Sequence, residues 1–364
     1  MVKKIISFLL VLSFLFSFGC ATESKNEKNE YDSENYEITS ILKDKKFEKG
    51  FYVRGLGVPI YDDPIETFGD RYESRVNFCY GQNYRPDWHL CQWASRYPFH
   101  DTGNTTFEMK DGKKTFNYKY TQLGENHHLY ENQSKTLEVD TDEGEIRFLL
   151  KGSECYKEDR SFGQEWPHFL IEQDLCTAAK LSSANRICTA DAIKVHLSLR
   201  VNDFVDYMGE RANEGLHSAM CVFYLYVSNY SPEKRAFTDM LWFGMIVFDN
   251  RYTYSEPMSR ADGYKDSATN KWIYNLDGHD FYSPENNVYD KDGNIIYNEW
   301  KTIDVELSEH IRSAFDTAQE NGYMQNSKWE NLYINGMYVG FELPGTYDLD
   351  MSVKDMDILT IREK

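Results

Sequence analysis

Three segments of the chain place polar and aromatic side chains at every second position. Segments 166–173, 192–201 and 218–229 each alternate such residues with apolar ones. A period of two puts each set on one side of a β-sheet. If the three strands lie in one sheet, a single surface of that sheet carries His168, Glu172, His196, Arg200, Tyr224 and Tyr226.

This combination of side chains suits a carbohydrate, which presents hydroxyl groups at its edge and an apolar patch on its flat side. Tyrosine rings such as Tyr224 and Tyr226 can stack on a sugar and still use their hydroxyls. The planar fork of Arg200 can bind a carboxylate or paired hydroxyls, which would favour an acidic polysaccharide. The alternative is an ordinary solvated sheet face, because antiparallel sheets commonly leave one face in water.

Two tryptophans offer a second candidate for sugar stacking. Trp88 and Trp93 lie five positions apart, with His89 and Gln92 between them, in a stretch that reads as a loop. Exposed tryptophans in such a loop would stack on sugar rings, whereas a buried tryptophan is the more common outcome.

The hypothesis of a catalytic function has less support from the residues. Glu138, Asp140 and Glu143 have the E-x-D-x-x-E spacing of laminarinase-like glycoside hydrolases, in which two glutamates perform the reaction. The turn expected at 141–144 would place Glu143 in water, so we interpret the match as coincidence. A lyase could instead use His168 or His196 with a tyrosine as base and acid.

Metal-binding patterns are equally weak. His127 and His128 are adjacent, and adjacent residues of a strand point to opposite faces. Asp290 opens a turn that resembles the start of a calcium-binding loop, but the distant bidentate glutamate of that loop is missing. We therefore expect no cofactor, with a structural calcium ion as the alternative.

The elements that must position these residues are nearly all strands. Polar turns bound further runs of β-branched and aromatic residues, and one hairpin turn joins 135–140 to 145–152. One helix is predicted over 308–321, where apolar residues recur at helical spacing, Ser308 can cap and Gly322 can end the helix. Many strands and one accessory helix predict an all-β fold, a large antiparallel β-sandwich of the jelly-roll type. The other predicted strands are 105–110, 114–120, 238–249, 329–343 and 347–358.

Two segments carry a resemblance to known domains. Segments 340–358 and 242–251 resemble strands of concanavalin-like jelly-roll sandwiches and of carbohydrate-binding modules. The resemblance implies a sugar-binding sandwich, in some members with hydrolase or lyase activity and in some with a structural calcium ion. It assigns no catalytic residue.

The N-terminus indicates export. Lys3 and Lys4 precede an apolar run over 5–16, and the sequence Ser-Phe-Gly-Cys follows at 17–20. This is the pattern of a secretory signal peptide, and the cysteine after glycine resembles the lipobox of bacterial lipoproteins. We expect a signal peptide at 1–19, an acylated Cys20 with a disordered tether at 20–46, and one domain at 47–364. The protein would be lipid-anchored and extracytoplasmic in the cell envelope; the alternatives are an ordinary signal peptide or an uncleaved anchor.

Charge and cysteine content narrow the partners. A net charge of −19 argues against nucleic acid, because phosphate binding needs a basic surface. Six cysteines remain besides Cys20, which permits disulfides in an exported protein, with Cys79–Cys91 and Cys176–Cys188 as candidate pairs. The alternative is six free thiols.

Three functions stay open at this point. The leading hypothesis is a cell-surface lipoprotein that binds carbohydrate on one face of the sandwich, without catalysis. The second is a glycoside hydrolase or polysaccharide lyase on the same fold. The third is a structural or adhesive surface protein without a glycan site.

Overall fold

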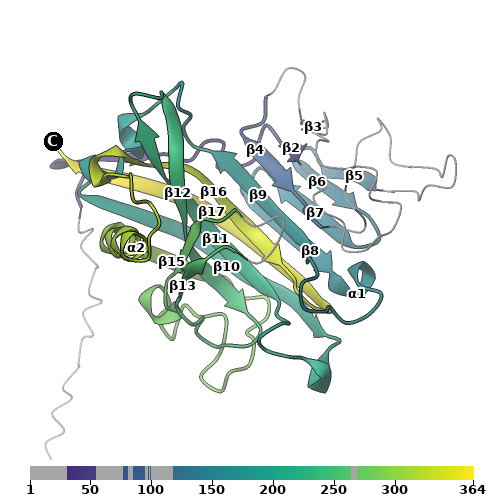
Figure 1. Cartoon of the computed structure of the whole chain (residues 1–364). Helices are drawn as coiled ribbons and strands as arrows, with labels where there is room; N and C mark the ends of the chain where they lie inside the picture. Colours follow the sequence, from purple (N-terminus) through teal and green to yellow (C-terminus); the bar gives the residue numbers. More distant parts are fainter. Residues whose placement is uncertain are drawn as a thin grey trace, which may run out of the picture.

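The computed structural model describes residues 31–54, 77–80, 85–94, 97, 99, 118–263 and 269–364. Two large β-sheets pack face to face and form the body of the molecule (Figure 1). The predicted all-β sandwich is therefore confirmed. The predicted signal peptide, Cys20 and the strands 105–110 and 114–117 lie outside the described residues.

The first sheet, called sheet A, is antiparallel throughout. In spatial order it contains β15 (Lys301–Glu306), β10 (Ala192–Asp206), β17 (Tyr347–Glu363), β8 (Glu145–Lys151), β7 (Lys135–Asp140), β6 (His127–Glu131) and β5 (Lys119–Gly124), and β1 (Tyr36–Ser40) pairs with β17.

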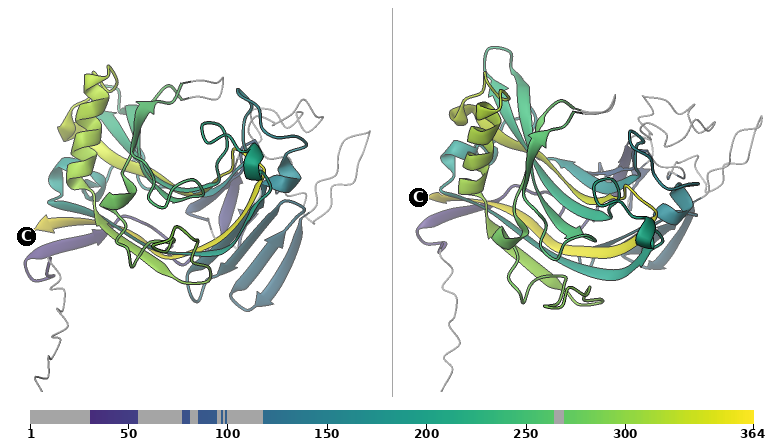
Figure 2. Two further views of the ribbon diagram at one scale, coloured as in Figure 1. Left: turned by 90° about the horizontal axis from the view of Figure 1, so that it is seen from below. Right: turned by 60° about the horizontal axis from the view of Figure 1, so that its bottom comes forward.

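The second sheet, sheet B, is antiparallel except for the pairs β12–β14 and β2–β4. Its spatial order is β13 (Met258–Ala261), β14 (Trp272–Asn275), β12 (Ala236–Asp249), β11 (Met220–Ser231), β16 (Leu332–Glu342), β9 (His168–Asp174), β4 (Trp88–Cys91), β2 (Phe51–Arg54) and β3 (Asn77–Phe78). The sheets bend together, so that the outer face of sheet B is concave (Figure 2).

The core lies between the sheets and contains the apolar side chains that occupy every second position of each strand. Leu197 and Leu199 of β10 and Leu225 and Val227 of β11 are completely buried in one continuous cluster. Each fully buried leucine or valine contributes about 1.5–3 kcal/mol relative to an exposed one. The alternation that predicted the strands therefore holds the sandwich together.

Helix α2 (Ser308–Glu320) is the one long helix in the described part of the chain, and it packs at one end of the sandwich (Figure 1). Its apolar positions are buried as predicted, and Gly322 ends it with φ +86°. The predicted cap is wrong. Ser308 is the first helical residue, and its hydroxyl accepts a hydrogen bond from the Ile193 amide at 3.0 Å.

The remaining helices are single turns. They comprise α1 (Gly152–Cys155) and 3₁₀ turns at Ser183–Asn185, Ile187–Thr189, Gly209–Arg211, Gly278–Asp280 and Trp329–Asn331. In the part of the chain that the structure describes, no helix is both long and apolar enough to cross a membrane.

The expected disordered tether does not extend to residue 46. Residues Tyr36–Ser40 form β1, which pairs along its whole length with β17, and Ile41 and Leu42 are 6% exposed. Within β1, Tyr36 and Thr39 are half-buried and the other three residues are exposed, which explains why the composition of the segment is polar. Main-chain pairing with β17 compensates for the small apolar surface.

Neither candidate disulfide is formed. Cys176 Sγ lies 3.8 Å from the carbonyl oxygen of Ile334, and Cys188 Sγ lies 3.7 Å from that of Glu330. The expected Cys79–Cys91 bridge is likewise wrong, because the Cys91 thiol points toward Glu172 instead, at 3.8 Å.

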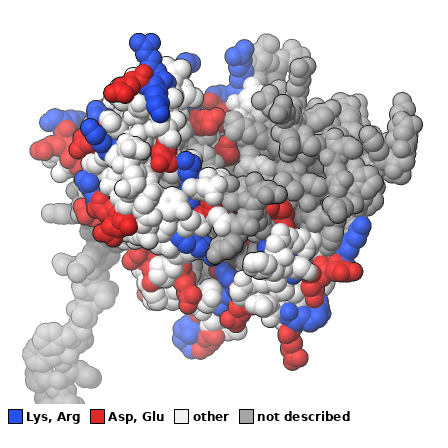
Figure 3. Space-filling view, in the orientation of Figure 1, with Lys and Arg blue, Asp and Glu red and all other residues white. Residues whose placement is uncertain are grey.

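Acidic and basic side chains are interspersed over the described part of the face in Figure 3.

Candidate functional site

The six residues predicted to share one face belong to two different sheets. His168 and Glu172 lie on β9 and Tyr224 and Tyr226 on β11, and both strands flank β16 in sheet B. His196 and Arg200 lie on β10, between β15 and β17 in sheet A. The predicted common surface is therefore wrong. The alternation of polar and apolar residues determines on which side of its own sheet a side chain lies. It does not show which sheet the strand joins.

The sheet B residues do form a shared surface, on the concave outer face. Glu172, Tyr338 and Tyr224 are direct cross-strand partners on β9, β16 and β11. The Tyr226 hydroxyl donates to Glu172 Oε2 at 3.1 Å, which ties β11 to β9 across β16. Trp242 of β12 stands opposite Tyr226, with ring centroids 4.7 Å apart in an edge-to-face arrangement.

Two glycines determine how the tyrosine rings lie. A Cβ atom on Gly244 would be 2.4 Å from the Tyr224 ring, and one on Gly336 would be 2.4 Å from the Tyr226 ring. Each tyrosine ring therefore occupies the space above a glycine on the neighbouring strand. Both rings are thereby fixed in place, and Tyr226 is the half-buried one of the two, whereas Tyr224 is only 6% exposed.

The environment keeps these phenols protonated. Burial raises the pKa of Tyr224, of Tyr226 and of Tyr338. The negative charge of Glu172 raises the pKa of Tyr226 further. The hydroxyls are thus neutral at physiological pH and remain hydrogen-bond donors.

A second aromatic cluster lies at the other end of the same face. The His168 ring lies between Trp93 and Trp166, with centroid distances of 5.6 and 5.7 Å. Trp166 Nε1 donates to Glu342 Oε2 at 3.1 Å, and His168 Nε2 lies 3.6 Å from the same oxygen. All three rings are half-buried, so each presents part of its surface on the concave side.

Trp88, the other tryptophan of the predicted pair, is not part of this face. It is completely buried, packs on Phe47 and donates from Nε1 to the carbonyl oxygen of Asp44 at 2.8 Å. It therefore serves as a core anchor and cannot stack on a ligand.

Two carboxylates that contact the aromatic clusters, Glu172 and Glu342, are far apart along their strands. Glu342 pairs with His168 on β9, four residues from Glu172, which corresponds to about 13 Å at 3.3 Å per residue. Between them lies an apolar row formed by Leu170, Gly340 and Val222. The carboxyl groups of glycoside hydrolases lie about 5–10 Å apart. Asp174 lies two residues from Glu172 on the same side of β9, about 7 Å away at 3.3 Å per residue, so the carboxylates of this face do not by themselves separate binding from hydrolysis.

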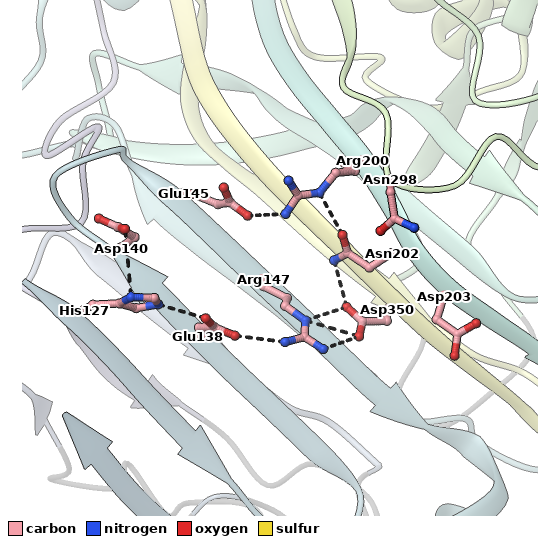
Figure 4. Close-up of a pocket in the computed structure, with 10 residues that line it drawn as sticks. All are labelled: His127, Glu138, Asp140, Glu145, Arg147, Arg200, Asn202, Asp203, Asn298 and Asp350. Carbon is pink, nitrogen blue, oxygen red and sulfur yellow. Dashed lines mark hydrogen bonds and ion pairs between the residues drawn. The ribbon is translucent and has the colours of Figure 1, made fainter. Parts of the chain in front are cut away.

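On the convex outer face of sheet A, His196 and Arg200 have separate surroundings. His196 Nδ1 lies 3.4 Å from Asp304 on the exposed surface. Arg200 lines a polar cavity of about 590 Å³ (Figure 4). Glu138 and Asp140 of the E-x-D-x-x-E motif line the same cavity, whereas Glu143 is exposed in the hairpin turn as predicted.

No group of three or more potential metal ligands occurs among the described residues. Asp290 Oδ1 accepts from the backbone amides of Asp292 and Asn294, at 2.9 and 2.8 Å, so its turn satisfies its own carboxylate. His127 and His128 point apart as predicted. His127 contacts Glu138 at 2.8 Å, and His128 stacks on Tyr80.

Sequence reasoning missed several residues of the concave face. Trp242 and Tyr338 lie within predicted strands, and Gly244 and Gly336 are each in phase with an outward aromatic residue. A glycine opposite a tyrosine is visible only once the strand register is known. Trp166 and Glu342 lie at strand ends, where alternation carries little information.

No protein-family model matches the chain, and no curated protein matches it. Among solved structures, the endoglucanase Cel12A from Rhodothermus marinus is 12% identical with a TM-score of 0.33, over 66% of this chain and 93% of that chain. The family 12 xyloglucanase from Bacillus licheniformis is 11% identical with a TM-score of 0.35, over 68% and 97% of the two chains.

Proposed function

We propose that the concave face of sheet B binds a carbohydrate chain. The observation that carries the proposal is the pair of half-buried rings of Tyr226 and Trp242, held in place beside the more deeply buried Tyr224 and Glu172. Flat, fixed rings stack on sugars, and a carboxylate accepts hydrogen bonds from hydroxyl groups.

The ligand of this face is a neutral glycan. Glu172 and Glu342 are tied into the two aromatic clusters and repel anions, and Arg160, 4.8 Å from the Trp166 ring, already donates to the carbonyl oxygens of Gln164 and Leu216. Arg200, which suggested an acidic polysaccharide, lies on the other sheet. The distance between the clusters suits an extended chain of several sugar units.

Glycan-array binding with analysis of the bound sugars tests this function. We expect retention of neutral oligosaccharides that stay intact after long incubation. Shortened products would show a hydrolase, and shortened products with an unsaturated end would show a lyase. Binding to no glycan would instead favour the structural or adhesive role.

We also propose that the protein is an extracytoplasmic lipoprotein of the cell envelope, anchored through Cys20. The support is the sequence pattern at 1–20 and the polar segment that separates it from β1. Cys20→Ser should release the protein from the membrane fraction, because a single thioether-linked lipid group is the proposed attachment. Ser17→Ala leaves the cysteine in place and is the control. Membrane retention of the serine variant, measured by fractionation, would contradict the anchor.

A further inference from the structure

The polar cavity on the outer face of sheet A is separate from the concave face and lies on the opposite side of the sandwich. It has a volume of about 590 Å³ and is lined by side chains of five strands and of the loop before β15 (Figure 4). This volume is within the range of small-ligand sites, about 300–1,000 Å³.

Two arginines give the cavity a fixed shape. Arg147 donates to both oxygens of Asp350, at 2.6–3.2 Å, and to Glu138 at 2.9 Å. Arg200 donates to Glu145 at 2.7 Å and to Asn202 at 2.8 Å. Paired charges on adjacent strands hold the walls in place, so a ligand would not have to order them.

Other groups in the cavity retain hydrogen-bonding capacity. Asp203 is exposed and, among the residues that the structure describes, accepts only from the backbone amide of Phe204, at 3.0 Å. The Asn298 side chain makes no hydrogen bond within the described part of the chain, and its backbone amide is fixed to Val201. The cavity thus offers unused acceptors and unused amide donors side by side.

These polar and charged groups determine which class of ligand fits the cavity. The five carboxylates outnumber the two arginines and disfavour an anion, no three described groups are placed to hold a metal ion, and the polar walls offer nothing to an apolar molecule. Sugar hydroxyls both donate and accept, so they match both kinds of group. The Trp300 ring, 4.5 Å from the Arg200 guanidinium, adds an aromatic side chain next to the cavity.

We propose that this cavity is a second carbohydrate site, which takes a short neutral oligosaccharide independently of the concave face. The protein would then hold sugar on both outer faces of the sandwich. The proposal goes beyond binding at sheet B and does not require it.

The indole N–H resonances of two tryptophans distinguish the two sites in an NMR titration of the folded protein. Trp300 reports on the cavity and Trp242 on the concave face. The probes are cello-, xylo- and manno-oligosaccharides of four to six units, added one at a time. We expect the Trp300 resonance to shift saturably with at least one probe.

The decisive variant is Asp203→Ala combined with Asn298→Ala. Both side chains are exposed and neither holds a strand in place, so the fold should be unchanged. The apparent affinity at Trp300 should fall by about tenfold or more, because two hydrogen bonds are lost, while the Trp242 response stays the same. Asp304→Ala, on the same face but outside the cavity, is the matched control.

The outcomes distinguish the two proposals. Movement of Trp242 alone overturns the second site and leaves the concave face supported. Movement of Trp300 alone supports the cavity and counts against the concave face. A Trp300 shift that the double variant leaves unchanged, or no Trp300 shift with any probe, overturns the cavity site.

Discussion

Replacing Gly340 with alanine should destabilise the protein by about 3–5 kcal/mol. Gly340 has φ +149° and lies two residues before the end of β16, where that strand is paired on both sides, with β9 and β11. An alanine Cβ would lie 2.4 Å from the Cα atom of Leu170 and 2.5 Å from the carbonyl oxygen of Phe169. Backbone atoms of a central strand cannot move aside singly, so β9 would have to separate from β16. Urea unfolding monitored by tryptophan fluorescence measures the loss.

Gly322→Ala is the control for this experiment. Gly322 also has a positive φ, +86°, but no atom lies within 4 Å of the position that an alanine Cβ would take there. Backbone strain alone should cost about 1 kcal/mol at this residue. Equal losses for the two variants would mean that the sheet accommodates the extra methyl group and that the close approach of β9 and β16 is not required.

Trp242→Ala should weaken glycan binding by about 30- to 100-fold while the protein stays folded. Trp242 is half-buried, meets Tyr226 and Tyr338 edge-to-face and donates from Nε1 to Thr269 at 3.0 Å. Its removal takes away ring surface and also frees Tyr226 to leave its place over Gly336. Calorimetric titration with an oligosaccharide identified on the array gives the affinity, and thermal unfolding gives the stability.

Trp300→Ala provides the matched comparison, because Trp300 is also half-buried but belongs to the opposite outer face. Its effect on binding at the concave face should be small. If Trp300→Ala reduced that binding as much as Trp242→Ala, the concave face would not be the principal site.

Much of the fold could be predicted from local pattern. The hairpin of β7 and β8 and the buried side of α2 follow from residues close in the sequence, whose periodicity records which side is apolar. The predicted ends of the strands were less accurate. β10 continues to Asp206 and β17 to Glu363, beyond the predicted ends, because pairing with each other extends both strands past their apolar runs.

The candidate site could be predicted only in part. Glu172, Tyr224 and Tyr226 were correctly placed on one face, since their strands are both neighbours of β16. Arg200 was wrongly added to them, because its strand pairs with residues near the C-terminus, about 150 positions away. Sheet membership depends on such distant partners, and no local signal encodes it.

The aromatic content was interpreted correctly as a property of strands, but its organisation was not predicted. The seating of Tyr224 and Tyr226 depends on glycines that face them from other strands. A single sequence shows these glycines only as weak points of a strand. In the folded sheet, these glycines leave the space that the tyrosine rings occupy.

The pairing of β1 with β17 brings the two ends of the described fold together. Tyr36 lies opposite Glu363, and the backbone amide of Lys364 donates to the carbonyl oxygen of Asn35 at 3.0 Å. The chain therefore leaves the sandwich where it entered it. A few residues could join these ends covalently, and new ends could be opened in the exposed turn at 232–235 between β11 and β12. The protein can thus be made as a circular permutant without altering either outer face of the sandwich.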